Sequence, residues 1–396
     1  MKICIVCPRL CHGGAERVAV SLANGFVARG HEVFFFADLF EEQTFVLHNA
    51  VKVRNLVPQT NNKLLKWGGA IRLLRKELKK DKPDVIVGIM SLCSIVAQLA
   101  SMGLRIPVIA TEHNSYERPK TAHMPSFIKL YKFFLCKFFS CVTVLTEADK
   151  KVIDNRIKNV VVMPNPLALL PTESIPNKKK TILAAGRVDN WHVKGFDVLI
   201  RAFSKLVQRS KFKVQSEGWK LVIAGVWRSP ETRTYLDSIA KECGVLDKIE
   251  YIGFVEDMQK LYAESSIFVL SSRYEGFGLV LIEAMSQGCA CVACDYKGRQ
   301  REIMSPTPTL PEGEGENLTP TLPEGEGAFE ACETGILCEP DDVEALAEAM
   351  KKMIEDDEYR ESVRAKAIER SKYYSIENTM DRWEALLKQV TGVKQL

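Results

Sequence analysis

A chain of 396 residues with 46% hydrophobic residues and a mean hydropathy of −0.07 has a globular composition, and its length suits two to three domains of about 150 residues each. Its longest apolar runs, such as residues 267–270, are far shorter than the ~20 residues of a membrane-spanning helix, and residues 1–8 are too short for a signal peptide, so we expect a cytoplasmic protein. Of the 54 Lys and Arg and 50 Asp and Glu in the chain, residues 1–170 contain 24 and 13, which leaves 30 and 37 for the rest. The basic first half favours an anionic partner such as a membrane surface, and no nucleic-acid-binding motif accompanies it.

Short β-branched segments alternate with helical patterns along the first part of the chain. We expect strands at 2–7, 32–37, 51–56, 84–88, 107–111, 141–145 and 160–163, and helices at about 15–29, 62–81, 92–102, 126–139 and 146–155. The proline-rich segment 164–179 interrupts the pattern and is predicted to be a linker.

The alternation then restarts, with expected strands at 181–186, 220–225, 249–253, 267–271, 290–294 and 336–338. Helices are expected near 195–209, 231–243, 257–265 and 277–288, and the chain after Pro340 is helical in pattern to its end. Alternating strands and helices indicate parallel sheets with right-handed crossovers. The sequence therefore predicts an α/β protein with two doubly wound domains in tandem and a cleft between them.

One segment departs from this plan. Residues 307–315 read Thr-Pro-Thr-Leu-Pro-Glu-Gly-Glu-Gly, and residues 319–327 repeat them identically. Because this segment has almost nothing to bury, we expect residues 305–330 to be an acidic insertion that is disordered. A tolerated surface insertion and a regulatory or partner-binding loop both fit its composition.

The twelve cysteines of the chain are expected to be reduced thiols. Cys4, Cys7 and Cys11 with His12, and the cysteines of residues 289–294, could be taken for metal sites. Both groups lie in or beside apolar runs, where cysteine acts as a small hydrophobic residue, and no paired Cys-x-x-Cys motifs with zinc-finger spacing occur. We therefore favour core packing over a metal site.

Glycines and cations follow the first expected strand of each domain. Gly13 and Gly14 open a helix, where glycine allows close approach of a phosphate and the helix start offers free N–H groups, although a plain turn has the same sequence. In the second domain, Gly186-Arg187 ends the first strand, and Lys194 precedes the next helix. Two cations at the carboxyl edge of a parallel sheet suit a diphosphate and would stabilise it as a leaving group; two ordinary surface cations are the alternative.

The sharpest signal is the run Ser-Ser-Arg-Tyr-Glu-Gly-Phe-Gly at residues 271–278, followed by a helix. Glu275 is expected in a glycine loop at the end of a strand, and Glu283 on a helix face that is otherwise apolar. The glycines expose backbone N–H groups, and the second carboxylate could accept hydrogen bonds from ribose hydroxyls. On the residues alone, a structural salt bridge explains Glu283 as well.

Taken together, these motifs resemble the family-4 retaining glycosyltransferases of the GT-B fold, and in particular bacterial capsule, exopolysaccharide and lipopolysaccharide members. The resemblance covers nearly the whole chain, including the Glu-x7-Glu motif at Glu275 and Glu283 and the closing segment from Tyr374 to Trp383. It implies two Rossmann-like domains facing across a cleft: residues 1–168 on the acceptor side, a linker at 169–179, and 180–374 for the nucleotide-sugar. Residues 375–396 would form a helix that crosses back onto the first domain.

The resemblance also implies roles for individual residues. The expected catalytic residues are Glu275, His113, Arg187 and Lys194. Arg187 and Lys194 would bind the donor diphosphate and assist its departure, while Glu275 would bind the transferred sugar and His113 would lie beside it. On the residues alone, His113 is an ordinary loop histidine. The further donor-binding residues implied by the family are Gly14, Phe254, Val255, Phe277, Gly278, Leu279, Glu283 and Glu302.

The implied reaction transfers a hexose or N-acetylhexosamine from a nucleotide-diphosphate sugar, with a UDP-sugar as the expected donor, to a lipid-linked oligosaccharide or polysaccharide precursor of a surface glycan. No Asp-x-Asp motif occurs in the chain, and the family implies transfer without metal or cofactor. A nucleotide-sugar epimerase and a catalytically silent binding protein, with the insertion covering the donor pocket, are the competing hypotheses.

Two further features are open at this point. The loop from Arg187 to Lys194 is slightly longer than in the family and adds Trp191 and His192. The aromatic and basic stretch 126–139 fits either packing against its own sheet or shallow contact with the cytoplasmic face of a membrane.

Overall fold

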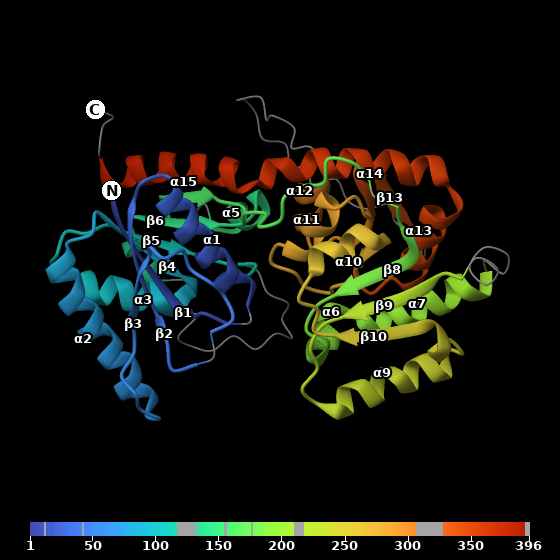
Figure 1. Ribbon diagram of the computed structural model, residues 1–396, viewed down its shortest axis with the longest axis horizontal. Coiled ribbons are helices and arrows are strands. Elements are labelled where there is room, and N and C mark those ends of the chain that lie inside the picture. Colours follow the sequence, from blue (N-terminus) through green and yellow to red (C-terminus); the bar gives the residue numbers. More distant parts are fainter. Residues whose placement is uncertain are drawn as a thin grey trace. The chain divides into compact units, whose positions relative to one another are not determined.

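The computed structural model describes residues 1–11, 13–41, 43–116, 131, 134–153, 157–175, 177–209, 218–305 and 328–392. The chain forms two compact units (Figure 1). Unit 1 contains Met1–Ala168 together with Ser375–Leu396, and unit 2 contains Leu169–Tyr374.

Unit 1 is built on a seven-stranded sheet in the order β3-β2-β1-β4-β5-β6-β7, with every neighbouring pair parallel. Its central strands contain continuous buried apolar runs, residues 3–7 of β1 and the whole of β4, as is usual for parallel strands covered on both faces. The strands are β1 (Lys2–Arg9), β2 (Glu32–Asp38), β3 (Lys52–Asn55), β4 (Val85–Ile89), β5 (Val108–Thr111), β6 (Cys141–Val144) and β7 (Val160–Val162). The helices are α1 (Gly14–Ala28), α2 (Lys63–Asp81), α3 (Met90–Ser101), the 3-10 helix η1 (Leu135–Phe138), α5 (Glu147–Ile153) and α15 (Ile376–Thr391).

Unit 2 is built on a second seven-stranded sheet, in the order β10-β9-β8-β11-β12-β14-β13. The pairs are parallel except β13 with β14, which is antiparallel. The strands are β8 (Lys179–Ala185), β9 (Lys220–Ala224), β10 (Ile249–Gly253), β11 (Ser265–Leu270), β12 (Ala290–Cys294), β13 (Phe329–Cys332) and β14 (Gly335–Cys338). The longer helices are α7 (Phe196–Arg209), α9 (Pro230–Glu242), α10 (Met258–Glu264), α11 (Leu279–Ser286), α13 (Val343–Glu355) and α14 (Asp357–Ser371). The short ones are η2 (Val188–Asn190), α6 (Trp191–Lys194), η3 (Leu246–Lys248), α12 (Arg299–Met304) and η4 (Lys372–Tyr374).

Helix α15 belongs to unit 1 although it ends the chain. Ser375 caps its first turn by accepting a hydrogen bond from the Asn378 backbone N–H. Met380 and Trp383, three residues apart, face α1, where the Trp383 ring meets Phe26 edge-on at 6.1 Å between centroids. This packing explains why the last helix is part of the first unit, and Figure 1 shows α15 beside α1.

The expected α/β architecture with two doubly wound domains is confirmed, and the strands lie within two residues of their predicted ends. Strand β13 was not expected: Phe329 and Glu330, at the end of the predicted insertion, pair with β14. The identical repeats lie outside the described residues, as do residues 126–130, 132 and 133 of the helix predicted over 126–139. Its described end is the 3-10 helix η1, which closes with the N–H of the following residue, Phe139, donating to the Cys136 carbonyl three residues earlier.

Two further expectations concern the cysteines, as core residues or metal ligands, and membrane-spanning helices. All twelve cysteines are free thiols, and ten of them are buried, so the interpretation of both clusters as core residues is confirmed. Among the described residues, no group of three or more His, Cys, Asp and Glu is arranged to hold a metal ion. Within the same residues, no helix is long and apolar enough to span a bilayer.

Candidate active site

The expected site residues of unit 2 follow the carboxyl ends of neighbouring parallel strands. Arg187 follows β8, Phe254 follows β10, and Glu275 follows β11. The chain runs from β8 outward to β9 and β10 and then returns to the other side of β8 as β11. This reversal makes the β8–β11 edge a topological switch point, where open α/β sheets bind ligands. In Figure 1, the arrowheads of β8, β9 and β10 end on the side of unit 2 that carries α6.

Lys194 and Glu275 form an ion pair at this switch point. The Lys194 Nζ atom donates to Glu275 Oε2 at 2.6 Å, and the two side chains are only 20% and 17% exposed. Ser272 Oγ donates to the same carboxylate oxygen at 3.3 Å. Lys194 is the last residue of α6, and Gly195 follows it in the left-handed conformation at φ 64°. The structure thus brings together two of the four expected catalytic residues.

Arg187 lies close to this pair in the chain but is exposed. Among the described residues, no side chain or backbone group forms a hydrogen bond or ion pair with its guanidinium group. A backbone hydrogen bond on each side of Arg187 sets the course of the loop, since the Gly186 N–H donates to the Ala224 carbonyl and the Val188 N–H donates to the Val226 carbonyl. Arg187 is therefore a cation at the carboxyl edge of β8 that is available to an anion.

Asp189 connects the loop after β8 to the loop after β9. Its carboxylate accepts hydrogen bonds from the backbone N–H groups of Arg228 at 2.8 Å and Ser229 at 3.2 Å. The Arg228 N–H is the main cause that holds the pKa of Asp189 below its ordinary value. Trp191 packs on Tyr235 with 4.5 Å between ring centroids. The loop after β8 is thus anchored to α9.

The glycine loop presents its backbone rather than its aromatic side chain. Phe277 is 3% exposed, and its ring packs on Tyr374 at 5.6 Å between centroids. Gly278 caps α11 at φ 89°, a conformation that favours glycine, and Leu279 begins the helix. The backbone N–H groups at this helix start are the groups that the family resemblance assigns to the donor sugar.

Glu283 lies inside unit 2. It is 2% exposed, and its Oε2 atom accepts a hydrogen bond from the hydroxyl group of the fully buried Tyr262 at 3.1 Å. Tyr262 belongs to α10, so this bond joins α10 to α11. In this conformation Glu283 has the environment of a buried structural carboxylate, and its expected contact with a ribose stays a prediction.

Two aromatic side chains lie at the end of the sheet formed by β9 and β10. Phe254 is 69% exposed directly after β10. Trp227, after β9, contacts the position where Gly253 would carry a Cβ atom, at 3.9 Å. Val255 is half-buried. Phe254 is thus open to a ligand at the carboxyl edge, and Trp227 lies beside the glycine that precedes it.

Glu302 lies in α12, the short helix that follows β12. Its carbonyl accepts hydrogen bonds from Arg370 Nη2 at 2.7 Å and from the Tyr374 hydroxyl at 3.4 Å. These bonds fix the backbone of α12 against α14 and η4. The main chain of Glu302 is therefore held by Tyr374, the residue whose ring packs on Phe277.

His113 follows β5 in unit 1 and is half-buried. Its Nε2 atom is 2.9 Å from Thr111 Oγ1, and its Nδ1 atom is 3.1 Å from Asn165 Oδ1. Desolvation lowers the pKa of His113 to about 4, although the hydrogen bond to Asn165 acts in the opposite direction. The imidazole is therefore neutral at pH 7, with both ring nitrogens held by the protein.

Gly14 is the first residue of α1, at the carboxyl end of β1. Glu16 is buried in the first turn of this helix, and its Oε1 atom pairs with Arg9 Nε at 3.2 Å. A Cβ atom on Gly13 would lie 1.8 Å from the Glu16 carboxylate. The start of α1 is thus occupied by a carboxylate of the chain itself, and exposed Gly14 stays a candidate for phosphate contact.

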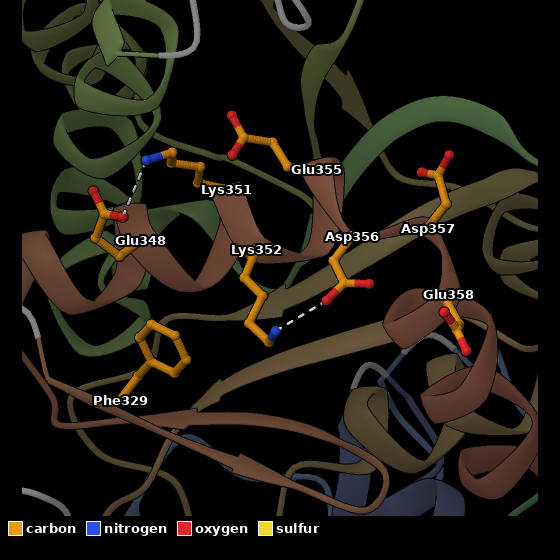
Figure 2. A pocket seen from close by; sticks show the side chains of 8 residues that line it. All are labelled: Phe329, Glu348, Lys351, Lys352, Glu355, Asp356, Asp357 and Glu358. Atoms are coloured by element: carbon orange, nitrogen blue, oxygen red, sulfur yellow. Dashed lines mark hydrogen bonds and ion pairs between the residues drawn. The ribbon is translucent and has the colours of Figure 1, made fainter.

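A hollow of about 530 Å³ lies elsewhere on unit 2, along α13 and the start of α14. Figure 2 shows its lining, in which Lys352 pairs with Asp356 at 3.1 Å and Lys351 with Glu348 at 3.6 Å. The other lining residues are Phe329, Glu355, Asp357 and Glu358. None of the expected site residues lines this hollow, and its acidic surface does not suit a diphosphate.

Comparison with known proteins decides the family. Residues 12–169 match the family model described as Glycosyltransferase Family 4, and residues 179–356 match the one described as Glycosyl transferases group 1. The chain is a GT-B glycosyltransferase. The two matches meet at the expected linker and together cover most of the glycosyltransferase.

Curated relatives align over most of this glycosyltransferase. One is an α-1,4-N-acetyl-D-galactosaminyltransferase of Campylobacter jejuni whose name gives GalNAc-α-(1→4)-GalNAc-α-(1→3)-diNAcBac-PP-undecaprenol; it is 26% identical over 98% of this chain and 99% of its own. Another is the amylovoran biosynthesis glycosyltransferase AmsD of Erwinia amylovora, which is 27% identical over 74% of this chain and 80% of its own.

Solved structures share the fold of the glycosyltransferase. Sucrose-phosphate synthase from Thermosynechococcus elongatus superposes with a TM-score of 0.77 at 17% identity, over 99% of this chain and 100% of its own. Anabaena HepE in complex with UDP and glucose superposes with a TM-score of 0.73 at 18% identity, over 98% of this chain and 100% of its own.

Sequence analysis of the glycosyltransferase missed several residues that shape the site. Arg273 lies in the same motif as Glu275 but was given no role. Asp189 and Trp227 carried a weaker signal, a carboxylate and an aromatic residue in loops after strands. Asp189 binds backbone groups of another loop and Trp227 meets the Tyr251 ring, and no sequence pattern identifies such contacts.

Proposed function

We propose that this protein transfers a hexose or N-acetylhexosamine, with retention of anomeric configuration and without a metal ion, from a UDP-sugar to a lipid-linked oligosaccharide or polysaccharide precursor. The observation that carries the proposal is the Lys194–Glu275 ion pair at the switch point of the second sheet. It combines a cation for a diphosphate with a carboxylate for sugar hydroxyls at the place where this architecture binds ligands.

Each site residue has a role in the proposed reaction. Lys194 and Arg187 bind the diphosphate and stabilise the negative charge that grows as the bond from the anomeric carbon to the phosphate oxygen breaks. Each charge-assisted contact of this kind contributes about 1.5–3 kcal/mol. Glu275 accepts hydrogen bonds from the transferred sugar and, while no donor is bound, keeps Lys194 in place.

The new bond joins the anomeric carbon to an acceptor oxygen on the same face of the sugar. The acceptor's proton passes to the departing phosphate oxygen, so the protein need not supply a base. The neutral His113, whose pKa is lowered to about 4, suits a residue that orients the sugar without taking up a proton.

The relatives support the choice of substrates. The name of the Campylobacter relative includes a diphospho-undecaprenol-linked saccharide, and that of the Erwinia relative includes amylovoran biosynthesis. The structure of HepE contains UDP and glucose. We therefore propose a polyprenyl-diphosphate-linked acceptor and a uridine donor.

A lipid-linked acceptor requires the enzyme to work at a membrane surface, and we propose contact through η1, on the cytoplasmic face. Phe134 and Phe138 are 51% and 57% exposed, and Lys137 lies over the Phe134 ring at 4.1 Å. Exposed aromatic rings beside a cation suit the boundary between lipid head groups and acyl chains. Tyr131 and Phe139 are buried in unit 1, so part of this stretch serves the core.

The decisive experiment is a donor screen. The purified protein is incubated with a panel of UDP- and GDP-sugars, in EDTA and in Mg²⁺, and release of the nucleoside diphosphate is measured with and without lipid-linked acceptors extracted from membranes. We expect release from one UDP-sugar, dependent on the extract and equal in EDTA and Mg²⁺. NMR of the product should show the anomeric configuration of the donor.

Variants connect the activity to the site. We expect Lys194→Ala and Glu275→Ala each to lower kcat/KM by about 100-fold or more, as loss of a positioned charged group does in other enzymes. Lys241→Ala, which removes an exposed lysine from the last turn of α9, is the matched control and should behave like the wild type.

Two outcomes favour the alternatives. Conversion of the donor without acceptor would point to an epimerase. Binding of UDP without turnover, restored when residues 306–327 are deleted, would point to a protein silenced by its insertion. Release only in Mg²⁺ would contradict the metal-independent reaction while leaving the transferase activity intact.

A further inference from the structure

The loop after β11 holds the end of α6 through three successive carbonyl groups. Arg273 Nη1 donates to the His192 carbonyl at 2.6 Å, and the Arg273 backbone N–H donates to the Val193 carbonyl at 2.9 Å. Ser271 Oγ donates to the Lys194 carbonyl at 2.8 Å. The last carbonyls of a helix have no partner within the helix, and here all three are bound by residues 271–273.

The guanidinium group of Arg273 has two further partners on different elements. Its Nη1 and Nη2 atoms each lie 2.7 Å from one carboxylate oxygen of Asp197, in the first turn of α7, and its Nε atom donates to Asp341. The Arg273 and Asp197 side chains are only 18% and 16% exposed. Because one carboxylate binds both Nη atoms of the planar guanidinium group, the group has a single orientation. Its contact with the His192 carbonyl is therefore fixed as well.

The backbones of these two segments are in direct contact. A Cβ atom on Gly195 would lie 1.9 Å from the Ser271 carbonyl oxygen, and Gly195 has a φ of 64°. Only glycine allows this approach. Lys194 lies between Gly195 and the carbonyls held by Arg273, and Glu275 lies two residues after Arg273. Arg273 therefore binds the main chain directly before Lys194 and lies itself two residues before Glu275.

We propose that Arg273 is a positioning residue, which sets the geometry of Lys194 and Glu275 for the donor by clamping the end of α6 to the loop after β11. The proposal rests on the transferase activity proposed above. Four of the five N–H donors of Arg273 are bound to Asp197, Asp341 and the His192 carbonyl, so it acts through the pair rather than on the donor.

Arg360 offers a matched control. Its Nη1 atom also donates to two backbone carbonyls, those of Met353 at 2.7 Å and Ile354 at 3.2 Å, and its Nη2 atom pairs with Asp357 at 2.8 Å. Its side chain is 13% exposed, close to the 18% of Arg273. Arg360 clamps the turn between α13 and α14, which carries none of the site residues. A purely structural effect should be alike in the two variants.

The test compares Arg273→Gln, Arg273→Lys and Arg360→Gln in steady-state kinetics with the donor identified by the screen. Misplacing a catalytic group by about 1 Å costs on the order of 100-fold, so we expect a loss of this size in kcat/KM for Arg273→Gln. Arg273→Lys keeps the charge but not the fork and should fall similarly. Arg360→Gln should retain wild-type kinetics at a temperature where all three are folded by circular dichroism.

A double-mutant cycle separates positioning from folding. In a Lys194→Ala, Glu275→Gln background, the pair that Arg273 positions is gone, so Arg273→Gln should cost less than about threefold more. The same 100-fold loss in that background would overturn the inference, as would wild-type kinetics of Arg273→Gln alone.

A second readout does not depend on turnover. In the wild type, Lys194 is engaged with Glu275, so its rate of acetylation, followed by mass spectrometry, should rise in Arg273→Gln and not in Arg360→Gln. An unchanged rate in Arg273→Gln would overturn the positioning role. A wild-type protein that turns over no donor would overturn the proposed function, while the acetylation comparison would still decide the role of Arg273.

Discussion

The backbone of Gly225 lies against the carbonyl group of Gly186: a Cβ atom on Gly225 would be 1.7 Å from the Gly186 oxygen. Gly225 has a φ of 149°, which side chains rarely adopt, and its own N–H donates to the Gly253 carbonyl at 2.8 Å. The loops after β8, β9 and β10 are thus stacked through main-chain contacts. Arg187 directly follows Gly186 in the chain, so the backbone that carries its exposed guanidinium group is held by these contacts.

Replacing Gly225 should therefore damage the fold. We expect Gly225→Ala to lower the free energy of unfolding by at least about 2 kcal/mol, because the methyl group displaces backbone that has no room to move. Gly244→Ala is the control, since Gly244 has a φ of 69° with no atoms within 4 Å of a Cβ position. It should lose only about 1 kcal/mol, the cost of a left-handed alanine. Urea unfolding measures both, and equal losses would contradict the steric explanation.

The start of α1 offers a test of non-additivity. Gly13→Ala should destabilise the protein by about 1–2 kcal/mol, because the new methyl group displaces the buried Glu16 carboxylate from Arg9. The φ of Gly13 is −153°, so alanine itself is not strained there. In a Glu16→Ala background, the same change should cost close to nothing. Urea unfolding of the four proteins decides, and additive losses would argue against this contact.

His113 should make stability depend on pH in a defined window. Its pKa is about 4 in the folded protein, below the ordinary 6.5, so between these values the unfolded chain binds more protons. Stability should therefore fall as pH drops from 6.5 toward 4, and be unaffected by this group above 6.5. In His113→Gln, the loss over this window should be smaller than in the wild type.

Titration of the imidazole itself provides a direct check. The NMR signal of the His113 ring C–H next to both nitrogens should stay constant from pH 8 to about pH 5. A midpoint near 6.5 would contradict the desolvated environment.

Trp383 tests the docking of α15 on α1. It is 3% exposed and meets Phe26 edge-on, so Trp383→Ala should lower the free energy of unfolding of unit 1 by about 3–5 kcal/mol. Tyr373→Ala, which removes a 40% exposed ring, should have a much smaller effect. Thermal unfolding followed by circular dichroism compares the two, and equal shifts would contradict the assignment of α15 to this core.

The fold could be predicted from the sequence to a large extent because parallel strands covered on both faces read as continuous apolar runs. β12, at Ala290–Cys294, was predicted at its observed ends for this reason. The structure differs from the prediction at elements that are short or that lie at the edge of a sheet. β13 is a half-buried edge strand with a charged residue in it, and α6 has only four residues, so neither has a periodic signal.

The sequence predicts which residues form the candidate site, but it does not predict which of them contact one another. Lys194 and Glu275 are 81 residues apart in the chain, and the strand order, which the residues alone do not specify, brings them together. Glu283 shows the converse: its position in the motif was clear, but its burial against Tyr262 depends on the packing of α10. Arg273 was passed over because its partners are carbonyls of α6 and carboxylates of residues far away in the chain.

The contact between Phe277 and Tyr374 has a practical consequence for protein engineering. Tyr374 is the last residue of unit 2, and the chain enters unit 1 at Ser375. A substitution at position 277 will therefore also disturb the residue before the joint between the units, because the Phe277 ring packs on it. Any change in catalysis by such a variant has to be compared with the effect of a companion change at Tyr374.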